Sequence, residues 1–262
     1  FVHGVGVGLG PYMTLIDDLA QLDTTVMLVE LPFISMNFCL HVPTIEECVD
    51  HVRDAMGACG LQRGMFVGHS FGTHVCSWMV QRAPEFVESC VLLDPVVMLL
   101  HLKTCLFGFV YDSCDKWDIS SILRTEPFIS NTIYRRTWWY RNVLWAEDLH
   151  VPSLVVLSET DEVVPSQAIW RYYRQYREEV LDGPEHVACM LYGLGHGGFL
   201  SDDKARGVVR IKMHELWTLT QARRVGSARA LRDGYGSGSS SDRSTASTAV
   251  EGVRVRGKGG GK

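Results

Sequence analysis

Apolar and polar positions along the chain repeat with two different periods. Runs of consecutive apolar and β-branched residues, typical of buried strands, occupy residues 24–30, 64–68, 90–93, 153–157 and 186–192. Apolar residues three and four positions apart, as on one face of a helix, occupy residues 11–22, 44–59, 70–82, 166–180 and 199–219. Because strands and helices alternate, the pattern predicts an α/β fold with a mostly parallel sheet flanked by helices.

This alternation stops between Asp94 and Pro152. An insertion of this size after a strand predicts a helical cap, at about residues 95–151, over the carboxyl edge of the sheet. Its apolar and aromatic residues form the core of the cap, line a pocket for an apolar acyl group, or face a membrane surface that delivers a lipid substrate. They include Leu99, Leu100, Leu102, Leu106, Phe107, Phe109, Trp117, Trp138, Trp139 and Trp145.

The two ends of the chain differ in composition and charge. Residues 223–262 are rich in Gly and Ser and contain nine Lys or Arg against three Asp or Glu. Such a segment buries too little apolar surface to offset the entropy of ordering. We therefore expect one α/β domain over residues 1–222 and a disordered tail over residues 223–262. The rest of the chain has 16 basic and 27 acidic residues, which excludes nucleic acid as the main partner, because phosphate binding needs a basic face.

The first residues, Phe1-Val2, have the character of the end of a strand. We therefore expect the first strands of the domain to be missing, with any targeting or membrane segment before them. Within the sequence, the most apolar stretch is residues 91–111, and it is interrupted by Asp94, His101 and Lys103. It falls short of the ~18 apolar residues that a membrane-spanning helix needs. Association with a membrane surface through a missing N-terminal segment stays open.

The eight cysteines form no C-x-x-C pair and no Cys/His metal spacing. Several of them lie within apolar runs, where cysteine behaves as a small buried hydrophobe. This favours reduced thiols in the core of an intracellular protein over a disulfide framework, and it indicates no metal site.

The strongest chemical signal is the pentapeptide Gly68-His-Ser-Phe-Gly72, of the form G-x-S-x-G. It follows a predicted strand and opens a predicted helix. Glycines on both sides permit a sharp turn in which Ser70 takes a strained backbone conformation and its hydroxyl stands exposed at the start of the helix. The context predicts that Ser70 is a nucleophile.

A serine nucleophile needs a base, usually histidine. Position selects His196 among the ten histidines, because it lies in a glycine-rich loop between the last predicted strand and the last predicted helix. His69 is expected to face the wrong side of the turn at Ser70, and His74 lies one helical turn further on. His186 lies in a predicted strand, and His41, His51 and His101 have no motif context.

The base in turn needs a carboxylate that orients it. Asp161 lies in the loop after the predicted strand 153–157, where its side chain can reach a histidine on the next loop. Asp94, after the strand 90–93, is the alternative, although it is expected mainly to turn the chain into the cap. Glu162 is the third candidate.

Stabilising the oxyanion of an acyl-transfer reaction needs two backbone N–H groups. We expect one from Phe71, directly after the nucleophile, and the other from Val5 in the glycine-rich loop that begins at Gly4. The same loop, with Glu30 at the end of the next strand, also resembles a dinucleotide-binding unit. The glycine spacing contradicts that alternative, since G-x-G-x-x-G would require glycine or alanine at Leu9, Pro11 or Met13.

Over about residues 1–219 the chain resembles the α/β-hydrolase superfamily. The resemblance rests on four motifs in order: His3-Gly4, G-H-S-F-G at residues 68–72, D-E-V-V-P at residues 161–165 and G-H-G at residues 195–197. The order Ser, Asp, His of the expected triad matches as well. More narrowly, two segments are similar to a group of eukaryotic hydrolases, some of which carry N-terminal membrane segments. These are F-V-H-G-V-G-V-G-L-G-P-Y at residues 1–12 and W-W-Y-R-N-V-L-W-A-E-D at residues 138–148.

The resemblance implies a serine hydrolase that acts by two-step acyl transfer on a small acyl ester or a lipid-like substrate, with no metal or organic cofactor. The alternative is an inactive member of the superfamily that serves as a binding or scaffold protein, because fold does not fix function. The presence of all three triad residues argues against the alternative.

Overall fold

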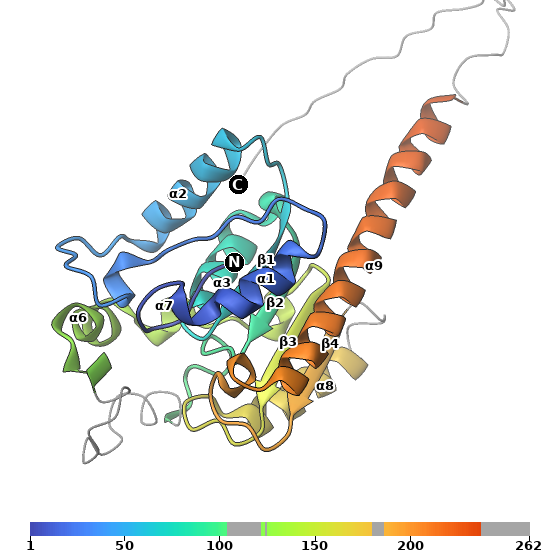
Figure 1. Cartoon of the computed structure of the whole chain (residues 1–262). Helices are drawn as coiled ribbons and strands as arrows, with labels where there is room; N and C mark the ends of the chain where they lie inside the picture. The colour runs from blue at the N-terminus through green and yellow to red at the C-terminus, as the bar shows by residue number, and fades with distance from the viewer. Residues whose placement is uncertain (104–121, 124, 180–185, 237–262) are drawn as a thin grey trace, which may run out of the picture. The chain divides into compact units, whose positions relative to one another are not determined.

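Four parallel strands form the sheet at the centre of the fold (Figure 1). The computed structural model describes residues 1–103, 122–123, 125–179 and 186–236, with the side chains of 178–179 and 226–236 left out. The sheet order is β1 (Gly64–His69), β2 (Val87–Leu93), β3 (Ser153–Ser158) and β4 (His186–Leu191). Every neighbouring pair is parallel, with Phe66 opposite Cys90 and Val156 opposite Cys189. The predicted parallel sheet is confirmed.

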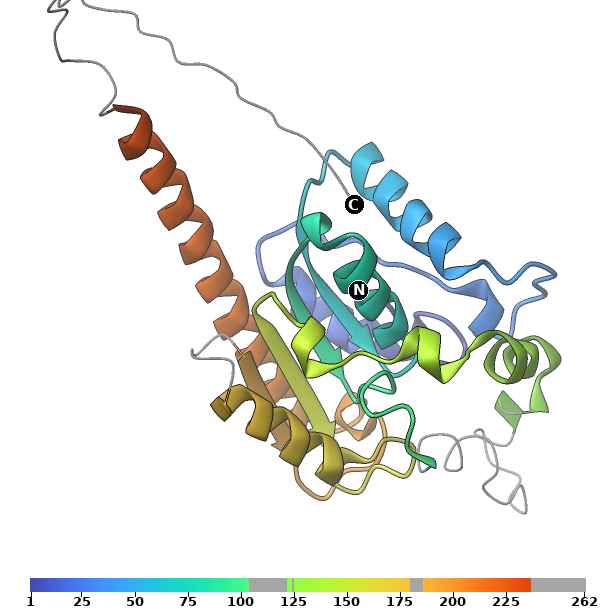
Figure 2. The same cartoon turned by 180° about the vertical axis from the view of Figure 1, so that it is seen from behind.

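Alternate side chains of the strands point to two separate apolar cores, one on each face. Val91 and Val156 belong to the core under α1 (Met13–Ala20) and α9 (Asp203–Gly236). Their chain neighbours Leu92 and Val155 belong to the core that also contains residues of three other helices. These are α2 (Ile45–Ala58), α3 (Gly72–Arg82) and α8 (Ser166–Glu179). Helices therefore cover both faces, as the two opposite views show (Figure 2).

The predicted strand over residues 24–30 is wrong. Only Val29 pairs, through an isolated bridge to Val2, which also bridges to Gly68 of β1. Beside this bridge, Phe1 accepts a hydrogen bond from the Val29 amide and donates one from its amino group to Met27. Residues 24–30 are accordingly exposed or half-buried.

Two compact units divide the chain at residue 223, Phe1–Arg223 and Arg224–Lys262. The last helix is expected to end at Leu219, but α9 continues to Gly236. Residues 228–232 read A-R-A-L-R, all of them strong helix formers, so the first part of the expected tail is helical. Residues 237–262 lie outside the described part, and their disorder stays a prediction.

The described part of the insertion between β2 and β3 contains the helices α6 (Pro127–Arg136) and α7 (Trp139–Asn142), joined by turns and irregular segments. Thr132 of α6 donates a hydrogen bond to the carbonyl of Phe33, and Asn142 of α7 accepts one from Trp78 of α3. Leu106, Phe107, Phe109 and Trp117 lie outside the described residues. The described residues also include short 3₁₀ helices at Gly10–Tyr12, Pro32–Ile34, Pro84–Phe86, Ala146–Asp148 and Gly198–Leu200.

Two further expectations concern cysteines and membranes. The cysteines in the described part are all free: Cys39, Cys48, Cys59, Cys76, Cys90 and Cys189. Among the described helices, none combines the length and apolarity needed to cross a bilayer.

Candidate active site

Ser70 sits at the sharp turn between β1 and α3. Its φ is +51°, a left-handed conformation that is uncommon for residues other than glycine. The turn requires both flanking glycines, because a Cβ on Gly68 would lie 2.7 Å from the Gly72 carbonyl oxygen and a Cβ on Gly72 would collide with the Val2 carbonyl. Ser70 is held by its amide, which donates to Leu93, and by its carbonyl, which accepts from Thr73. The pentapeptide therefore forms the expected elbow.

His196 connects Ser70 to Asp161. Its Nε2 lies 2.8 Å from Ser70 Oγ, and its Nδ1 lies 2.7 Å from Asp161 Oδ2. With the Nδ1 proton donated to the carboxylate, Nε2 is left to accept the serine proton. The fold thus brings together the three residues expected from the sequence, although they are up to 126 positions apart in the chain.

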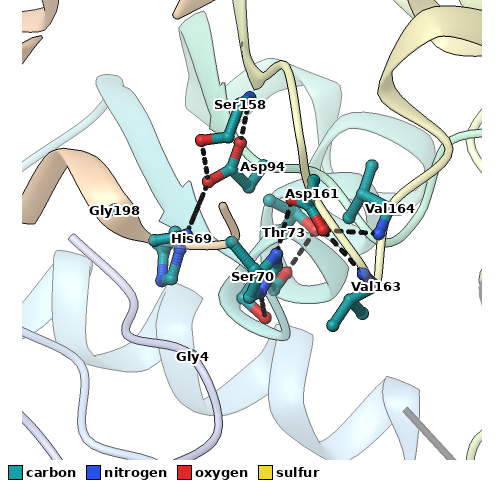
Figure 3. Close-up of polar contacts among 12 residues, drawn as sticks. Gly4, His69, Ser70, Thr73, Asp94, Ser158, Asp161, Val163, Val164 and Gly198 are labelled. Atoms are coloured by element: carbon teal, nitrogen blue, oxygen red, sulfur yellow. Dashed lines mark hydrogen bonds and ion pairs between the residues drawn. The ribbon is translucent and has the colours of Figure 1, made fainter. Parts of the chain in front are cut away.

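Asp161 is fixed by its own loop. Oδ1 accepts hydrogen bonds from the amides of Val163 (2.8 Å) and Val164 (2.7 Å), as Figure 3 shows. The loop follows β3, which ends at Ser158. Because one oxygen is occupied by the loop, the other is directed at His196.

Several charges act on His196. Burial lowers the pKa of its imidazole, but the hydrogen bond and negative charge of Asp161 outweigh burial, and the charges of Asp94 and Glu162 add to them. The pKa of His196 is therefore raised above its ordinary value. Glu162 itself lies 3.4 Å from the backbone amide of His196, so its contact is with the loop and not with the ring.

Asp94 does more than turn the chain. Its side chain is fully buried beside the triad, and its carboxylate accepts hydrogen bonds from Ser158 and from the amide of Gly197. Burial raises the pKa of this carboxyl. In the described structure no hydrogen bond joins Asp94 to the His196 ring, whereas Asp161 makes one. The geometry therefore favours Asp161 over Asp94 as the residue that orients the base.

The glycine-rich loop lies directly against Ser70. A Cβ on Gly4 would be 2.9 Å from the Cβ of Ser70, so only glycine fits. The Gly4 amide donates to the Tyr12 hydroxyl, and the Leu31 amide donates to His3 Nε2, which leaves the His3 Nδ1 proton to bond the Gly4 carbonyl at 2.7 Å. The peptide between Gly4 and Val5 is thereby held in one orientation.

Sequence reasoning missed the polar residues behind the site. His69 does not face away as expected, because its ring centroid lies 5.3 Å from that of His196 and its Nδ1 bonds the Tyr12 hydroxyl. Nothing in the local sequence indicates Tyr12, which is buried next to His69 with a pKa raised by burial to about 12. The dismissal of two other histidines is consistent with their contacts, since His74 stacks on Trp78 and His186 bonds Ser153.

One group in the described part of the chain has the spacing of a metal site, and it consists of Asp94, Asp161 and His196. The contacts of these residues are already accounted for. Asp161 is bonded to His196, and Asp94 is bonded to Ser158 and Gly197. The cluster is therefore explained by hydrogen bonding between its own members and the loops around them.

Known structures share this architecture. The chain is 17% identical to a serine hydrolase from the polyaromatic hydrocarbon-degrading bacterium Cycloclasticus zankles, covering 81% of this chain and 88% of that one with a TM-score of 0.59. For the monoacylglycerol lipase of Paleococcus ferrophilus the identity is 15%, the coverage 84% and 93%, and the TM-score 0.56. For a thermophilic esterase from Thermogutta terrifontis the values are 14%, 82% and 88%, and 0.57.

A search of curated protein sequences gives no match. A family model for the α/β hydrolase fold matches residues 1–118, which include the glycine-rich loop and the elbow at Ser70. The match to this family model over residues 1–118 and the likeness to the solved structures over most of the chain agree on one architecture, and the chain has the α/β-hydrolase fold.

Proposed function

We propose that this chain is a serine hydrolase in which Ser70 is the nucleophile, His196 the general base and Asp161 the residue that orients His196. The observation that carries the proposal is the continuous line of hydrogen bonds from Ser70 Oγ through the His196 ring to Asp161, at 2.8 and 2.7 Å. Nucleophile, base and orienting group within hydrogen-bond reach of one another are the signature of nucleophilic catalysis.

The expected reaction has two steps. Ser70 Oγ attacks the carbonyl carbon of an ester while its proton passes to His196 Nε2, and the resulting imidazolium then protonates the leaving alcohol. Water, deprotonated by the same nitrogen, attacks the acyl-serine and releases the carboxylic acid. Asp161 keeps the proton on Nδ1 throughout and stabilises the imidazolium.

The oxyanion would be bound by the backbone N–H groups of Phe71 and Val5. In a trans peptide the carbonyl and the N–H point in opposite directions, so the hydrogen bond from His3 to the Gly4 carbonyl also fixes the direction of the Val5 N–H. Among the described residues neither the Val5 nor the Phe71 amide has a hydrogen-bond partner, so both can donate to a substrate. Burial lowers the pKa of His3, which favours the neutral ring this arrangement needs.

The substrate class we propose is an acyl ester, with a lipid-like acyl group. Proteins of the same fold include an esterase and a monoacylglycerol lipase. In this chain, residues 95–151 would form the cap that selects the acyl group, and three of its tryptophans are partly exposed: Trp138, Trp139 and Trp145. Partly exposed aromatic residues fit both an apolar pocket and contact with a lipid surface.

Hydrolysis of a p-nitrophenyl ester as a function of pH tests the proposed chemistry. Because His196 must be neutral to accept the serine proton, we expect kcat/KM to rise with pH to a plateau. The midpoint should lie above the ordinary imidazole value of about 6.5, since Asp161, Asp94 and Glu162 raise the pKa of His196. A rate proportional to hydroxide across the whole range, equal to that of buffer alone, would contradict the proposal.

Acyl-chain preference tests the substrate class. Each methylene buried in a fitting pocket contributes about 0.8 kcal/mol, or roughly fourfold in kcat/KM. We therefore expect kcat/KM for p-nitrophenyl esters to increase from acetate to at least hexanoate or octanoate, measured below the critical micelle concentration. A steady decrease beyond acetate would exclude the lipid-like substrate and leave the chemistry of Ser70 untouched.

A further inference from the structure

We infer that Asp94 is a positioning residue of this active site. Its buried carboxylate connects the loop that contains His196 to the end of β3, which is followed by the loop that contains Asp161. The inference rests on the proposed function, because it concerns how His196 is held over Ser70.

The contacts of Asp94 connect the two loops directly. Its Oδ2 accepts from the amide of Gly197, the residue after His196, at 2.9 Å. The same oxygen accepts from Ser158 Oγ at 2.9 Å, and Oδ1 accepts from the Ser158 amide at 2.7 Å. Ser158 is the last residue of β3. One carboxylate therefore fixes the distance between the loop of the base and the strand end that precedes the loop of the acid. Figure 3 shows its two bonds to Ser158.

The backbone of Asp94 indicates that this placement is determined by its surroundings. Its φ is +44°, a conformation that non-glycine residues adopt rarely, although aspartate tolerates it better than most. Its amide donates to the Val156 carbonyl of β3, and its side chain is fully buried. A strained backbone and a buried carboxylate both cost free energy, so they persist at one position only where hydrogen bonds from neighbouring groups hold them in place.

The charges around Asp94 come from three segments. His196 lies on one side, Asp161 comes from the loop after β3, and His69 from the elbow places its Nε2 4.0 Å from Asp94 Oδ2. Glu162, in the same loop as Asp161, acts on His196. The carboxylate favours the His69 tautomer with its proton on Nε2, so that His69 Nδ1 accepts from the Tyr12 hydroxyl. Asp94 thus adds negative charge beside an imidazole that becomes positive during the reaction.

An amide at this position cannot replace the carboxylate. Three donors converge on the two oxygens of Asp94, whereas an asparagine side chain has one acceptor oxygen and an NH₂ group. If the oxygen of the introduced amide faces the Ser158 N–H, its NH₂ group faces the Gly197 N–H, and the two donors repel. If the amide is flipped, the Ser158 N–H loses its acceptor. The first orientation loses the bond to Gly197, and the second loses the bond to the Ser158 amide, so either way one of the three bonds is replaced by a repulsive contact without a change in side-chain size.

The test compares Asp94→Asn with wild type and with Asp18→Asn in the full chain. Asp18 is a matched control, because it is also a buried aspartate but pairs with Arg206 and Arg210 of α9. For Asp94→Asn we expect kcat to fall about 10- to 100-fold with KM nearly unchanged, as for a misplaced base. The acidic limb of its kcat/KM profile should shift to lower pH, because one negative charge near His196 is gone. Asp18→Asn should keep the wild-type kcat and the wild-type pH midpoint of the acidic limb of kcat/KM.

The activity of each variant is measured as the rate above that of Ser70→Ala. If the proposed function is wrong, Ser70→Ala itself keeps the wild-type rate, which separates that failure from a failure of the inference about Asp94. A folded Asp94→Asn with wild-type kcat and an unmoved limb would overturn the inference. A loss equal to that of Asp161→Asn would also overturn it, since Asp94 would then be the orienting acid. Should Asp94→Asn not fold, Ser158→Ala removes a single bond to the same carboxylate. We expect it to lower kcat by a few-fold, and an unchanged kcat would contradict the inference.

Discussion

The Ser70→Ala variant is expected to lose about 10⁴- to 10⁶-fold in kcat for ester hydrolysis, the loss typical of removing the nucleophile from a triad. Without Oγ no acyl-serine forms, and what remains is slow attack by water at the oxyanion site. Folding should be nearly unaffected, because the hydrogen bond recorded for Ser70 Oγ is the one to His196 and the backbone bonds of the elbow do not involve it. The measurement is p-nitrophenyl ester turnover together with the thermal unfolding midpoint.

A matched control is available on the same helix. Ser77 is fully buried in α3, and its Oγ has no hydrogen-bond partner among the described residues. Ser77→Ala should therefore keep full activity. If Ser70→Ala retained more than a few per cent of the wild-type rate at an unchanged melting temperature, Ser70 would not be the nucleophile.

The Asp161→Asn variant is expected to lose about 10⁴-fold in kcat. The amides of Val163 and Val164 donate to Oδ1, so the oxygen of the introduced asparagine would stay with them and its NH₂ group would face His196 Nδ1. The imidazole proton would then move to Nε2, and that nitrogen could no longer accept the proton of Ser70. Hydrolysis rates at a pH well above the acidic limb measure the loss independently of titration.

The ranking of three carboxylates checks this prediction. We expect the largest loss for Asp161→Asn, a smaller one for Asp94→Asn and the smallest for Glu162→Gln, because Glu162 contacts the backbone of His196 and not its ring. The opposite order for Asp161 and Asp94 would make Asp94 the acid. All three variants remove one negative charge, so the comparison isolates geometry from net charge.

The sequence was sufficient where function follows from position along the chain. In a parallel sheet the carboxyl ends of the strands lie at one edge, so loops after β1, β3 and β4 had to bring Ser70, Asp161 and His196 together. Strand and helix periods located these loops. The distances between the three side chains could not be read from any period, and the structure supplies them.

Sequence reasoning failed where an outcome depended on partners far away in the chain. Residues 24–30 have the composition of a strand, but within the described part of the chain only Val29 forms a bridge, with the distant Val2. Asp94 is ordinary in its local sequence, and its importance comes from Ser158 and Gly197, which lie 64 and 103 residues further along. Tyr12 and His69 meet in the same way across 57 residues. Local pattern cannot indicate such contacts.

The central claim is that Ser70 is an activated nucleophile, and covalent labelling tests it most directly. A fluorophosphonate probe reacts with a serine only when a base removes its proton. We expect one probe per folded chain, attached to the tryptic peptide Gly64–Arg82 and assigned by fragmentation to Ser70 and not to Ser77. Labelling should disappear in Ser70→Ala and slow strongly in Asp161→Asn. Folded wild-type protein that stays unlabelled at Ser70, or that carries the probe on another serine, would contradict the account.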